Sequence, residues 1–354
     1  MSIIHIAVIG PGKIADKMLV PALARTPGAK LWSVLSRDRA RAAEFAQRHG
    51  AASPAPAHDD LDLLLADPEL HAVIIATPDR LHAAQTIAAA RAGKHILCEK
   101  PMASSVEEAR AMVDAARAGG VRLGVAYHLR WHAGHRALRE RIQAGALGEL
   151  RHMRVHWTYR AADAKNWRAH DEVGRWWSLA AVGTHGVDLL RWIMCPAHGE
   201  VVEVRGLTTR TVWKGPHDET ALVALRFASG ATAELATSVV FDSPTRVEIF
   251  GSEASAIAEA TLGPRGAGHI TIAGQELAFT PVNPYEGELN DFVSAIRDHR
   301  EMEVSGDEGL RNVEILVQAS GGESVKPAES AKEPVKSKAA KAATKRPGGR
   351  RKSG

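Results

Sequence analysis

The sequence predicts an α/β fold in two folded units: a Rossmann-type doubly wound parallel sheet, then an α+β domain with a large, mostly antiparallel sheet. Two observations lead to this prediction. Before residue 126, short aliphatic runs alternate with helical segments about six times, which is typical of a doubly wound parallel sheet. After residue 126, the apolar residues alternate with polar ones over longer runs, as in strands with one buried face.

The first unit begins with the apolar run Ile3–Ile9, as expected for a strand buried on both faces. Further strands are expected at Lys30–Leu35, Ala72–Ala76, Ile96–Cys98 and Val121–Ala126, and helices at Ala15–Arg25, Arg39–His49, near Leu61–Ala66, up to Ala92 and at Val106–Ala118.

The second unit begins with an amphipathic helix at 135–144, closed by Gly145. Strands are expected at His152–Arg160, Val201–Leu207, Thr220–Phe227, Thr232–Phe241 and Arg246–Phe250, and helices at Tyr285–His299 and Asp307–Ala319. A large sheet with one apolar face usually packs against a partner, so we expect a homo-oligomer formed through this sheet.

The composition is that of a soluble protein of about two domains, with 354 residues, 45% of them hydrophobic and 24% charged. Cys98 and Cys195 provide no disulfide framework and indicate thiols in a reducing cytosol. We find no signal peptide before the first strand and no apolar run near the ~20 residues of a membrane span. A cytoplasmic protein without a membrane segment is therefore expected.

The positive charge is concentrated at the C-terminus. Residues 321–354 contain seven lysines and three arginines against three glutamates, so the rest of the chain is net negative although the whole carries +4. This composition predicts a disordered tail, and we divide the chain into units at 1–126, 127–319 and 320–354. The tail could bind nucleic acid or an anionic surface without sequence preference, or serve only as a solubilising extension.

The turn after the first strand carries a dinucleotide-binding pattern. Gly10 and Gly12 would form the turn and let the backbone approach a pyrophosphate, and Ala15 would let the following helix pack closely. Lys13 and Ile14 open that helix, whose N-terminus would hold the phosphates. The alternative is a purely structural glycine turn.

The next strand ends in Ser36-Arg37-Asp38. A serine and an arginine there suit the 2′-phosphate of NADP, whereas an acidic residue would suit the ribose of NAD. Asp38 lies one or two positions too far along the chain to contact the ribose, and it is expected to cap the next helix. The sequence therefore predicts NADP as the cofactor, with NAD as the alternative.

Two further turns follow strands of the parallel sheet. One carries Thr77, Pro78 and His82, and the other is Glu99-Lys100-Pro101. The carboxyl ends of parallel strands meet at one edge, so we expect these turns and the glycine turn to converge on one crevice. Lys100 is then a candidate for chemistry, and the alternative is a solvated lysine.

Several motifs together resemble the glucose–fructose oxidoreductase/inositol dehydrogenase (Gfo/Idh/MocA) family over about residues 3–319. They are Gly10–Ala15, Thr77-Pro78 with His82, Glu99-Lys100-Pro101, Tyr127-His-Leu-Arg130, Gly145–Gly148, Asn283–Leu289 and Ser305–Asn312. The resemblance implies an NAD(P)-dependent oxidoreductase that transfers a hydride between nicotinamide and a sugar, polyol or related hydroxy or carbonyl compound.

The resemblance also implies the roles of two residues. Lys100 would polarise the reacting oxygen, and His185 would take or return its proton. His185 is expected to open a helix over 184–194, where the positive end of the helix dipole would favour a neutral imidazole. Many family members have an aspartate four residues before this histidine, but here that position is Ala181. Asp188 is expected to orient rather than to react.

Other residues are weaker candidates. Tyr127, Arg130 and Tyr285 lie in the matched motifs and are assigned to the substrate, together with Asp188. Trp167 and Arg168 suit either a pocket wall or core packing. The spacing of His128, His132 and His135 could suggest a metal, but no carboxylate or cysteine completes the set, so no metal is assigned.

Two other functions remain open. One is a nicotinamide-dependent glycosidase of the same fold, which would oxidise a sugar transiently and turn over without consuming its cofactor. The other is an inactive dinucleotide-binding regulator that uses its basic tail to bind a polyanion. An oxidoreductase acting on a sugar-like substrate is the leading hypothesis.

Overall fold

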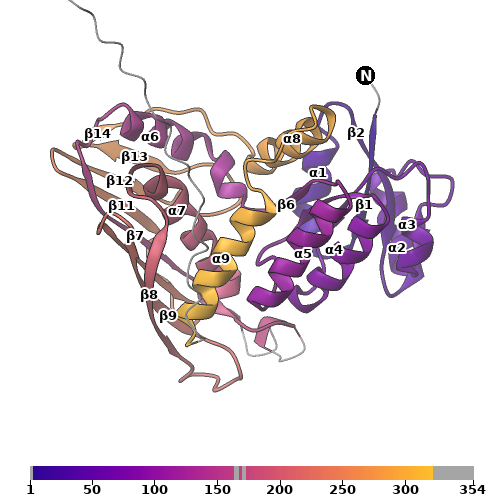
Figure 1. The fold of residues 1–354 in the computed structure, drawn as a ribbon, viewed down its shortest axis with the longest axis horizontal. Helices are drawn as coiled ribbons and strands as arrows, with labels where there is room; N and C mark the ends of the chain where they lie inside the picture. Colours follow the sequence, from indigo (N-terminus) through magenta and orange to yellow (C-terminus); the bar gives the residue numbers. More distant parts are fainter. Residues whose placement is uncertain (1–2, 163–166, 170–172, 322–354) are drawn as a thin grey trace, which may run out of the picture.

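The computed structural model describes residues 3–162, 167–169 and 173–321, which form two sheets with helices packed around and between them (Figure 1). The predicted tail therefore lies almost wholly outside the described residues. The first sheet is parallel, in the order β3-β2-β1-β4-β5-β6. Its strands are β1 Ile4–Ile9, β2 Ala29–Leu35, β3 Ala57–His58, β4 Ala72–Ile75, β5 His95–Cys98 and β6 Leu123–Val125. This order, with the chain crossing over beside β1, confirms the predicted Rossmann-type sheet.

The helices of this unit are η1 (a π-helical turn) Ala15–Leu19, α1 Val20–Leu23, α2 Arg39–His49, α3 Leu61–Leu65, η2 (a 3₁₀ turn) Asp79–Leu81, α4 His82–Arg91 and α5 Val106–Ala118. Three of them, α2, α3 and α5, start at side-chain caps. The Asp38 carboxylate accepts from Ala40 N at 2.9 Å, and Ser105 Oγ accepts from Glu108 N at 3.1 Å. These caps satisfy N–H groups that have no partner inside the helix. Asp38 therefore has the capping role predicted for it.

Alternate residues of the strands face opposite sides of the sheet, and both sides are buried. Ile9 and Ile75 pack with α4 and α5, whereas Val8 and Ile74 pack with α1 and α2. A strand buried on both faces must be apolar at nearly every position. This explains the nearly continuous apolar runs.

The second sheet has eight strands in the order β14-β13-β12-β11-β7-β10-β9-β8. They are β7 Leu150–Thr158, β8 Val201–Thr209, β9 Thr220–Phe227, β10 Thr232–Ser238, β11 Arg246–Gly251, β12 Ser255–Glu259, β13 His269–Ile272 and β14 Gln275–Glu276. All neighbours are antiparallel except β7 and β10, which are parallel. The sequence predicted this sheet but not its last three strands, which are short.

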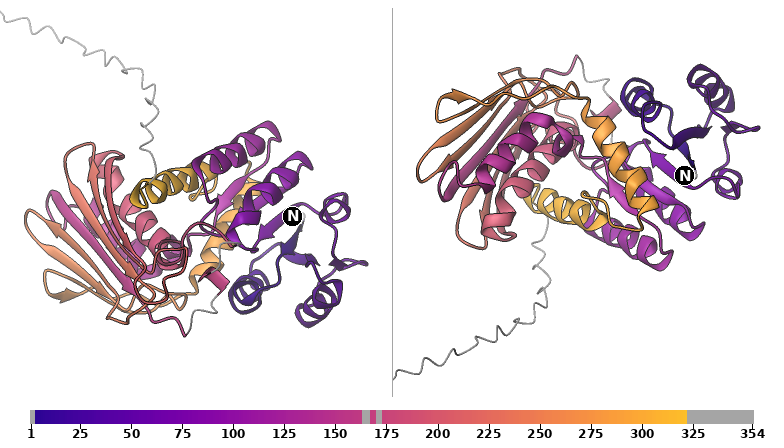
Figure 2. Two further views of the ribbon diagram at one scale, coloured as in Figure 1. Left: turned by 90° about the horizontal axis from the view of Figure 1, so that it is seen from below. Right: turned by 90° about the horizontal axis from the view of Figure 1, so that it is seen from above.

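Among the described residues, helices cover one face of the second sheet only. The inner face packs on α7 (Thr184–His198), which follows the π-helical turn η5 (Leu179–Gly183), and on α9 (Gly306–Ala319). The short 3₁₀ helices η3 (His128–Trp131) and η4 (Trp167–Ala169) and the helix α6 (Ala133–Gln143) complete this unit. Figure 2 shows the outer face of the sheet without a helix over it.

The C-terminal helices return to the first unit. Leu289 and Phe292 of α8 (Pro284–Arg297) are buried in the same core as Ile6 and Val8 of β1. Helix α9 contacts both α5 and β8, so it lies between the two sheets. The division of the chain at residue 126 stays a prediction. Helix α8 comes after this residue in the chain but packs on the unit that precedes it. None of the described helices has the length and apolar character needed to cross a membrane.

Candidate active site

A crevice of about 930 Å³ opens where the three predicted turns meet the second unit. Gly10, Thr77 and Lys100 contribute from the first unit, and His128 and His185 contribute from the elements that follow it. Strands β1, β4 and β5 all end at this edge, because they are neighbours in a parallel sheet. The convergence expected from the sequence is therefore present in the structure.

The glycine turn is shaped for a phosphate. Gly10 has φ +92°, and a Cβ there would lie 2.8 Å from Ala76 O, so only glycine fits. A Cβ at Gly12 would meet nothing within 4 Å, which leaves open space above the backbone. Lys13 and Ile14 line this space, and Ala15 is fully buried against the sheet. Free N–H groups of the first helical turn suit a pyrophosphate here.

The far end of the crevice is lined by Ser36 and Arg37. The Asp38 carboxylate is occupied by the cap of α2 and does not line the crevice. Arg41, which the sequence analysis did not single out, also lines it and donates from Nη2 to Pro11 O at 2.9 Å. Arg41 lies four residues after Arg37, in the first turn of α2, and this closeness in the chain was the signal available in the sequence.

The second turn contributes Thr77 and Pro78 to the crevice wall, and Thr77 Oγ1 donates to Gln85 Oε1 at 2.6 Å. His82 and Pro101 were also assigned to cofactor binding, but neither lines the crevice. His82 is fully buried beneath it, with its ring between Thr77 O and Pro101 O. The structure therefore places these two residues under the cofactor wall and not on its surface.

Lys100 lies at the junction of the two units. Its Nζ donates to Ala181 O at 3.0 Å and to Ala180 O at 3.3 Å. Both carbonyls belong to η5, the π-helical turn before α7. Burial and the nearby Arg168 guanidinium lower the pKa of Lys100 to about 8. Burial also raises the pKa of Glu99, which accepts from Lys100 N at 3.2 Å and also lines the crevice.

His185 does not open a helix, contrary to the prediction. Its helix α7 continues η5 without a break, so His185 lies within continuous helix. The start is instead capped by Asp218, which accepts from Trp177 N at 2.9 Å and Leu179 N at 2.8 Å. The helix-dipole argument for a neutral His185 therefore does not apply.

A neutral His185 follows from its surroundings instead. Burial, then the charge of Lys100, hold the pKa of His185 well below its usual value. Its ring meets the rings of His128 and Trp157 at centroid distances of 4.8 and 5.6 Å. His128 stacks in turn on Tyr285 at 4.5 Å, and both line the crevice. Tyr285 was predicted to be in the site, whereas His128 had been weighed only as a metal ligand.

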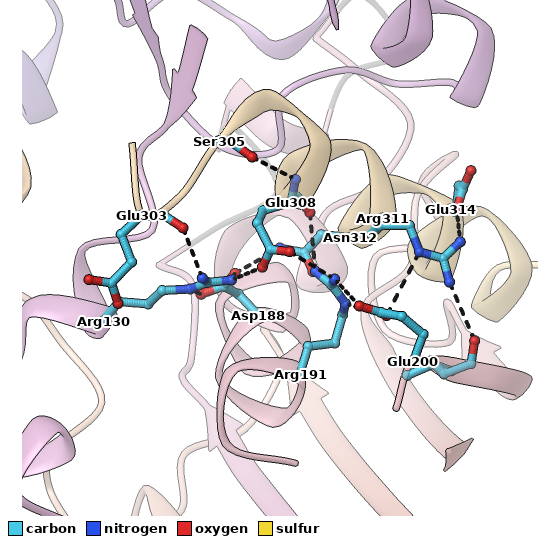
Figure 3. Close-up of polar contacts among 11 residues, drawn as sticks. Arg130, Asp188, Arg191, Glu200, Glu303, Ser305, Glu308, Arg311, Asn312 and Glu314 are labelled. Carbon is cyan, nitrogen blue, oxygen red and sulfur yellow. Dashed lines mark hydrogen bonds and ion pairs between the residues drawn. The ribbon is translucent and has the colours of Figure 1, made fainter. Parts of the chain in front are cut away.

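The structure assigns Arg130 and Asp188 a different place from the predicted substrate contacts. Arg130 donates to both carboxylate oxygens of Asp188, at 2.9 and 2.6 Å, and to Glu308 at 2.5 Å. Asn312 Nδ2 donates to Asp188 at 2.9 Å (Figure 3). Arg191 extends this network by bonding Asn312 and Glu308. These groups join η3, α7 and α9 behind the crevice and do not line it.

The remaining candidates divide between wall and core. Arg168 lines the crevice and donates to Asp79 at 2.5 Å, so it joins the second unit to the second turn. Tyr127 is buried behind His185, with its hydroxyl 2.6 Å from Thr184 Oγ1. Trp167 begins η4, but its side chain lies outside the described part. Within the described residues, no group of three or more potential ligands is placed to hold a metal ion.

A glycine turn at the end of a parallel strand, with a lysine and a histidine across the same crevice, defines the class of nicotinamide-dinucleotide-dependent oxidoreductases. The chain belongs to the Gfo/Idh/MocA family. A model described as an oxidoreductase family with an NAD-binding Rossmann fold matches residues 4–127, and one described as the GFO/IDH/MocA C-terminal domain matches residues 135–257.

Named relatives support this assignment. A 1,5-anhydro-D-fructose reductase of Ensifer adhaerens is 33% identical over 309 residues, covering 85% of this chain and 91% of the relative. An aldose-aldose oxidoreductase from Caulobacter crescentus, solved with glycerol, has the same fold, with a TM-score of 0.83, 24% identity and coverage of 92% and 100%. A levoglucosan dehydrogenase solved with NADH and L-sorbose has a TM-score of 0.78, 25% identity and coverage of 90% and 97%.

The network around Asp188 should be structural. Replacing Arg130 by Met leaves the carboxylate of Asp188 buried without its ion pair, which should lower the free energy of unfolding by about 3–5 kcal/mol. The neighbouring Arg136 pairs with Glu303 and is 41% exposed, so Arg136→Met should cost only about 1 kcal/mol or less. Urea denaturation measures both losses. Equal losses in the two variants would contradict the structural role.

Proposed function

We propose that this protein is an NAD(P)-dependent oxidoreductase that transfers a hydride between the nicotinamide and a sugar hydroxyl or carbonyl carbon. The observation that carries the proposal is the presence of Lys100 and His185 in the crevice that begins at the glycine turn. Relatives whose names state a substrate include enzymes of sugars, anhydrosugars and inositol, which supports this class of substrate. The bound nicotinamide would supply the acceptor or donor of the hydride.

The residues of the chain would handle the oxygen and the proton. A lysine ammonium has three N–H donors, and Lys100 directs two of them to the carbonyls of Ala180 and Ala181. The third would donate to the reacting oxygen of the substrate and stabilise negative charge on it. In the oxidation direction, His185 would accept the hydroxyl proton as the hydride leaves the carbon, and it would return that proton in the reduction.

The electrostatics suit these roles. An uncharged His185 can act as a base, and its lowered pKa keeps it uncharged at neutral pH. The pKa of Lys100 is lowered to about 8, so its ammonium is largely present at neutral pH and is lost as the pH rises through that value. The backbone carbonyls of Ala180 and Ala181 hold Lys100 without a carboxylate at position 181.

Lys100 should be required for turnover. Replacing it by Met should lower kcat/KM by about a hundredfold or more, because a positioned proton donor is removed. In the unmodified enzyme, kcat/KM should fall above pH about 8 as the ammonium is lost. Absorbance of NADPH or NADH with 1,5-anhydro-D-fructose, levoglucosan and L-sorbose measures both effects.

Lys94 provides a matched control, because it also donates to two carbonyls, at 2.7 and 2.8 Å, but lies away from the crevice. The folded fraction of Lys94→Met should keep normal turnover. Full activity in Lys100→Met would contradict the proposal. Turnover with no net change in NADPH would instead indicate the nicotinamide-dependent glycosidase, and cofactor binding without any turnover would indicate the regulator.

We propose NADP as the preferred cofactor. Ser36, Arg37 and Arg41 all line the far end of the crevice, and guanidinium groups bind phosphate with paired hydrogen bonds. Arg37→Ala should weaken binding of NADPH by roughly 10- to 100-fold and leave NADH binding nearly unchanged, since only NADPH has the 2′-phosphate.

Fluorescence titration measures these two affinities. The control is Arg39→Ala, because Arg39 is 69% exposed, pairs with Asp59 and does not line the crevice. Tighter binding of NADH than of NADPH by the unmodified protein would refute the preference.

We also propose that the outer face of the second sheet forms a homo-oligomer. Leu207 and Leu222 are cross-strand neighbours on this face and are 61% and 49% exposed. Arg154, Glu234 and Glu248 lie on the same face in ion pairs, which a second copy could complement. Two copies would remove both leucines from water.

Sedimentation velocity should show a dimer or larger species. Leu222→Lys should shift it toward monomer, because a charge would be buried in the interface. Leu63 is 66% exposed on α3, far from the sheet, so Leu63→Lys should leave the assembly unchanged. A monomeric unmodified protein would contradict the interface.

A further inference from the structure

His82 occupies an unusual position between two of the turns that build the crevice. Its side chain is fully buried, with 0% exposure. Nδ1 lies 2.9 Å from Pro101 O, and Nε2 lies 2.9 Å from Thr77 O. The same ring therefore contacts the turn that follows β4 and the turn that follows β5.

Both partners of the ring are carbonyl oxygens, which only accept hydrogen bonds. A neutral imidazole has one N–H donor, so its second nitrogen would direct a lone pair at an oxygen 2.9 Å away. Flipping the ring by half a turn would place C–H groups where the two nitrogens lie now, 2.9 Å from the carbonyl oxygens. This is too short, because C–H···O contacts usually have C···O distances of about 3.3–3.6 Å. Only the imidazolium, with two N–H donors, satisfies both contacts.

We propose that His82 is a permanently protonated positioning residue that ties the Thr77 turn to the Lys100–Pro101 turn. The positioning role of His82 rests on the proposed function, in which Lys100 donates to the reacting oxygen. His82 itself does not line the crevice, so it acts through the two turns and not on the substrate.

The surroundings of His82 support a positive charge. Asp79 is buried on the neighbouring turn η2, where its Oδ2 pairs with Arg168 and its Oδ1 has no hydrogen-bond partner among the described residues. Burial opposes the charge of His82, but the neighbouring groups, among them Asp79 and the carbonyl of Thr77, raise its pKa. The ionisable groups around the ring are thus Cys98 and Glu99 at the end of β5 and Asp79 on η2, with Arg168 paired to Asp79.

The charge also reaches Lys100 through Glu99. The imidazolium lowers the pKa of the Glu99 carboxyl against the effect of burial, and ionised Glu99 in turn raises the pKa of Lys100. Loss of the imidazolium would therefore leave Glu99 more protonated and Lys100 easier to deprotonate. The positioning residue and the polarising lysine are coupled by charge as well as by backbone.

His135 provides an internal control. It is also buried, but its ring contacts one carbonyl, Leu129 O at 3.2 Å, and one hydroxyl, Thr261 Oγ1 at 2.9 Å. A hydroxyl can donate, so a neutral ring satisfies both contacts. Burial lowers the pKa of His135 to about 3, in contrast to that of His82.

The protonation state is tested on the unmodified protein. Long-range ¹H–¹⁵N spectra of ¹⁵N-histidine-labelled protein, assigned with His82→Gln and His135→Gln, should show two protonated nitrogens for His82 between about pH 6 and 9. His135 should show one protonated and one bare nitrogen. A bare nitrogen on His82 would overturn the proposal, and this result does not depend on any substrate being found.

The positioning role is tested by kinetics. The glutamine of His82→Gln can donate from one nitrogen only, so one of the two carbonyls loses its hydrogen bond. We expect kcat/KM to fall about tenfold or more, the effect of losing one charge-assisted hydrogen bond. The fall of kcat/KM at high pH should move to lower pH, because Lys100 loses its proton more easily. His135→Gln should move neither. An unchanged pH profile in His82→Gln would refute the positioning role even if the variant is less active.

Discussion

The attachment of the Lys100 ammonium to the carbonyls of Ala180 and Ala181 is the contact on which the site depends. It joins a turn of the first sheet to the helix that carries His185, and these two come from different units of the chain. A half-buried ammonium needs acceptors to replace water, and the π-helical turn η5 supplies two. No carboxylate at position 181 is needed for this attachment.

Burial shifts the pKa of several titratable groups around this contact. It lowers the pKa of His185, His128 and Lys100 and raises that of Glu99. Buried charges are kept where partners are close, as in the pair Arg130–Asp188 behind the crevice. The crevice wall itself is net positive, because seven lysines and arginines of the described residues line it against Asp79 and Glu99, and this charge suits the phosphates of a dinucleotide.

Sequence reasoning failed where a role depends on which way a side chain points. Arg130 and Tyr127 lie in motifs of the family and Asp188 follows His185 by three residues, yet their side chains face a buried network or the back of His185. The start of the helix at His185 was misplaced because Asp218, which caps it, lies 33 residues later in the chain. A cap that arrives from a distant loop leaves no local signal.

The sequence by itself determined the two sheets, the glycine turn and the turns of Thr77 and Lys100, because apolar periodicity and the positions of glycine and proline are local properties. Only the tertiary structure decided that Arg41 joins Arg37, that His128 lies beside His185, and that His82 contacts two carbonyls. Each of these depends on segments far apart in the chain packing at one sheet edge. Distances across such packing, and the pKa values that follow from burial, are set by the whole fold.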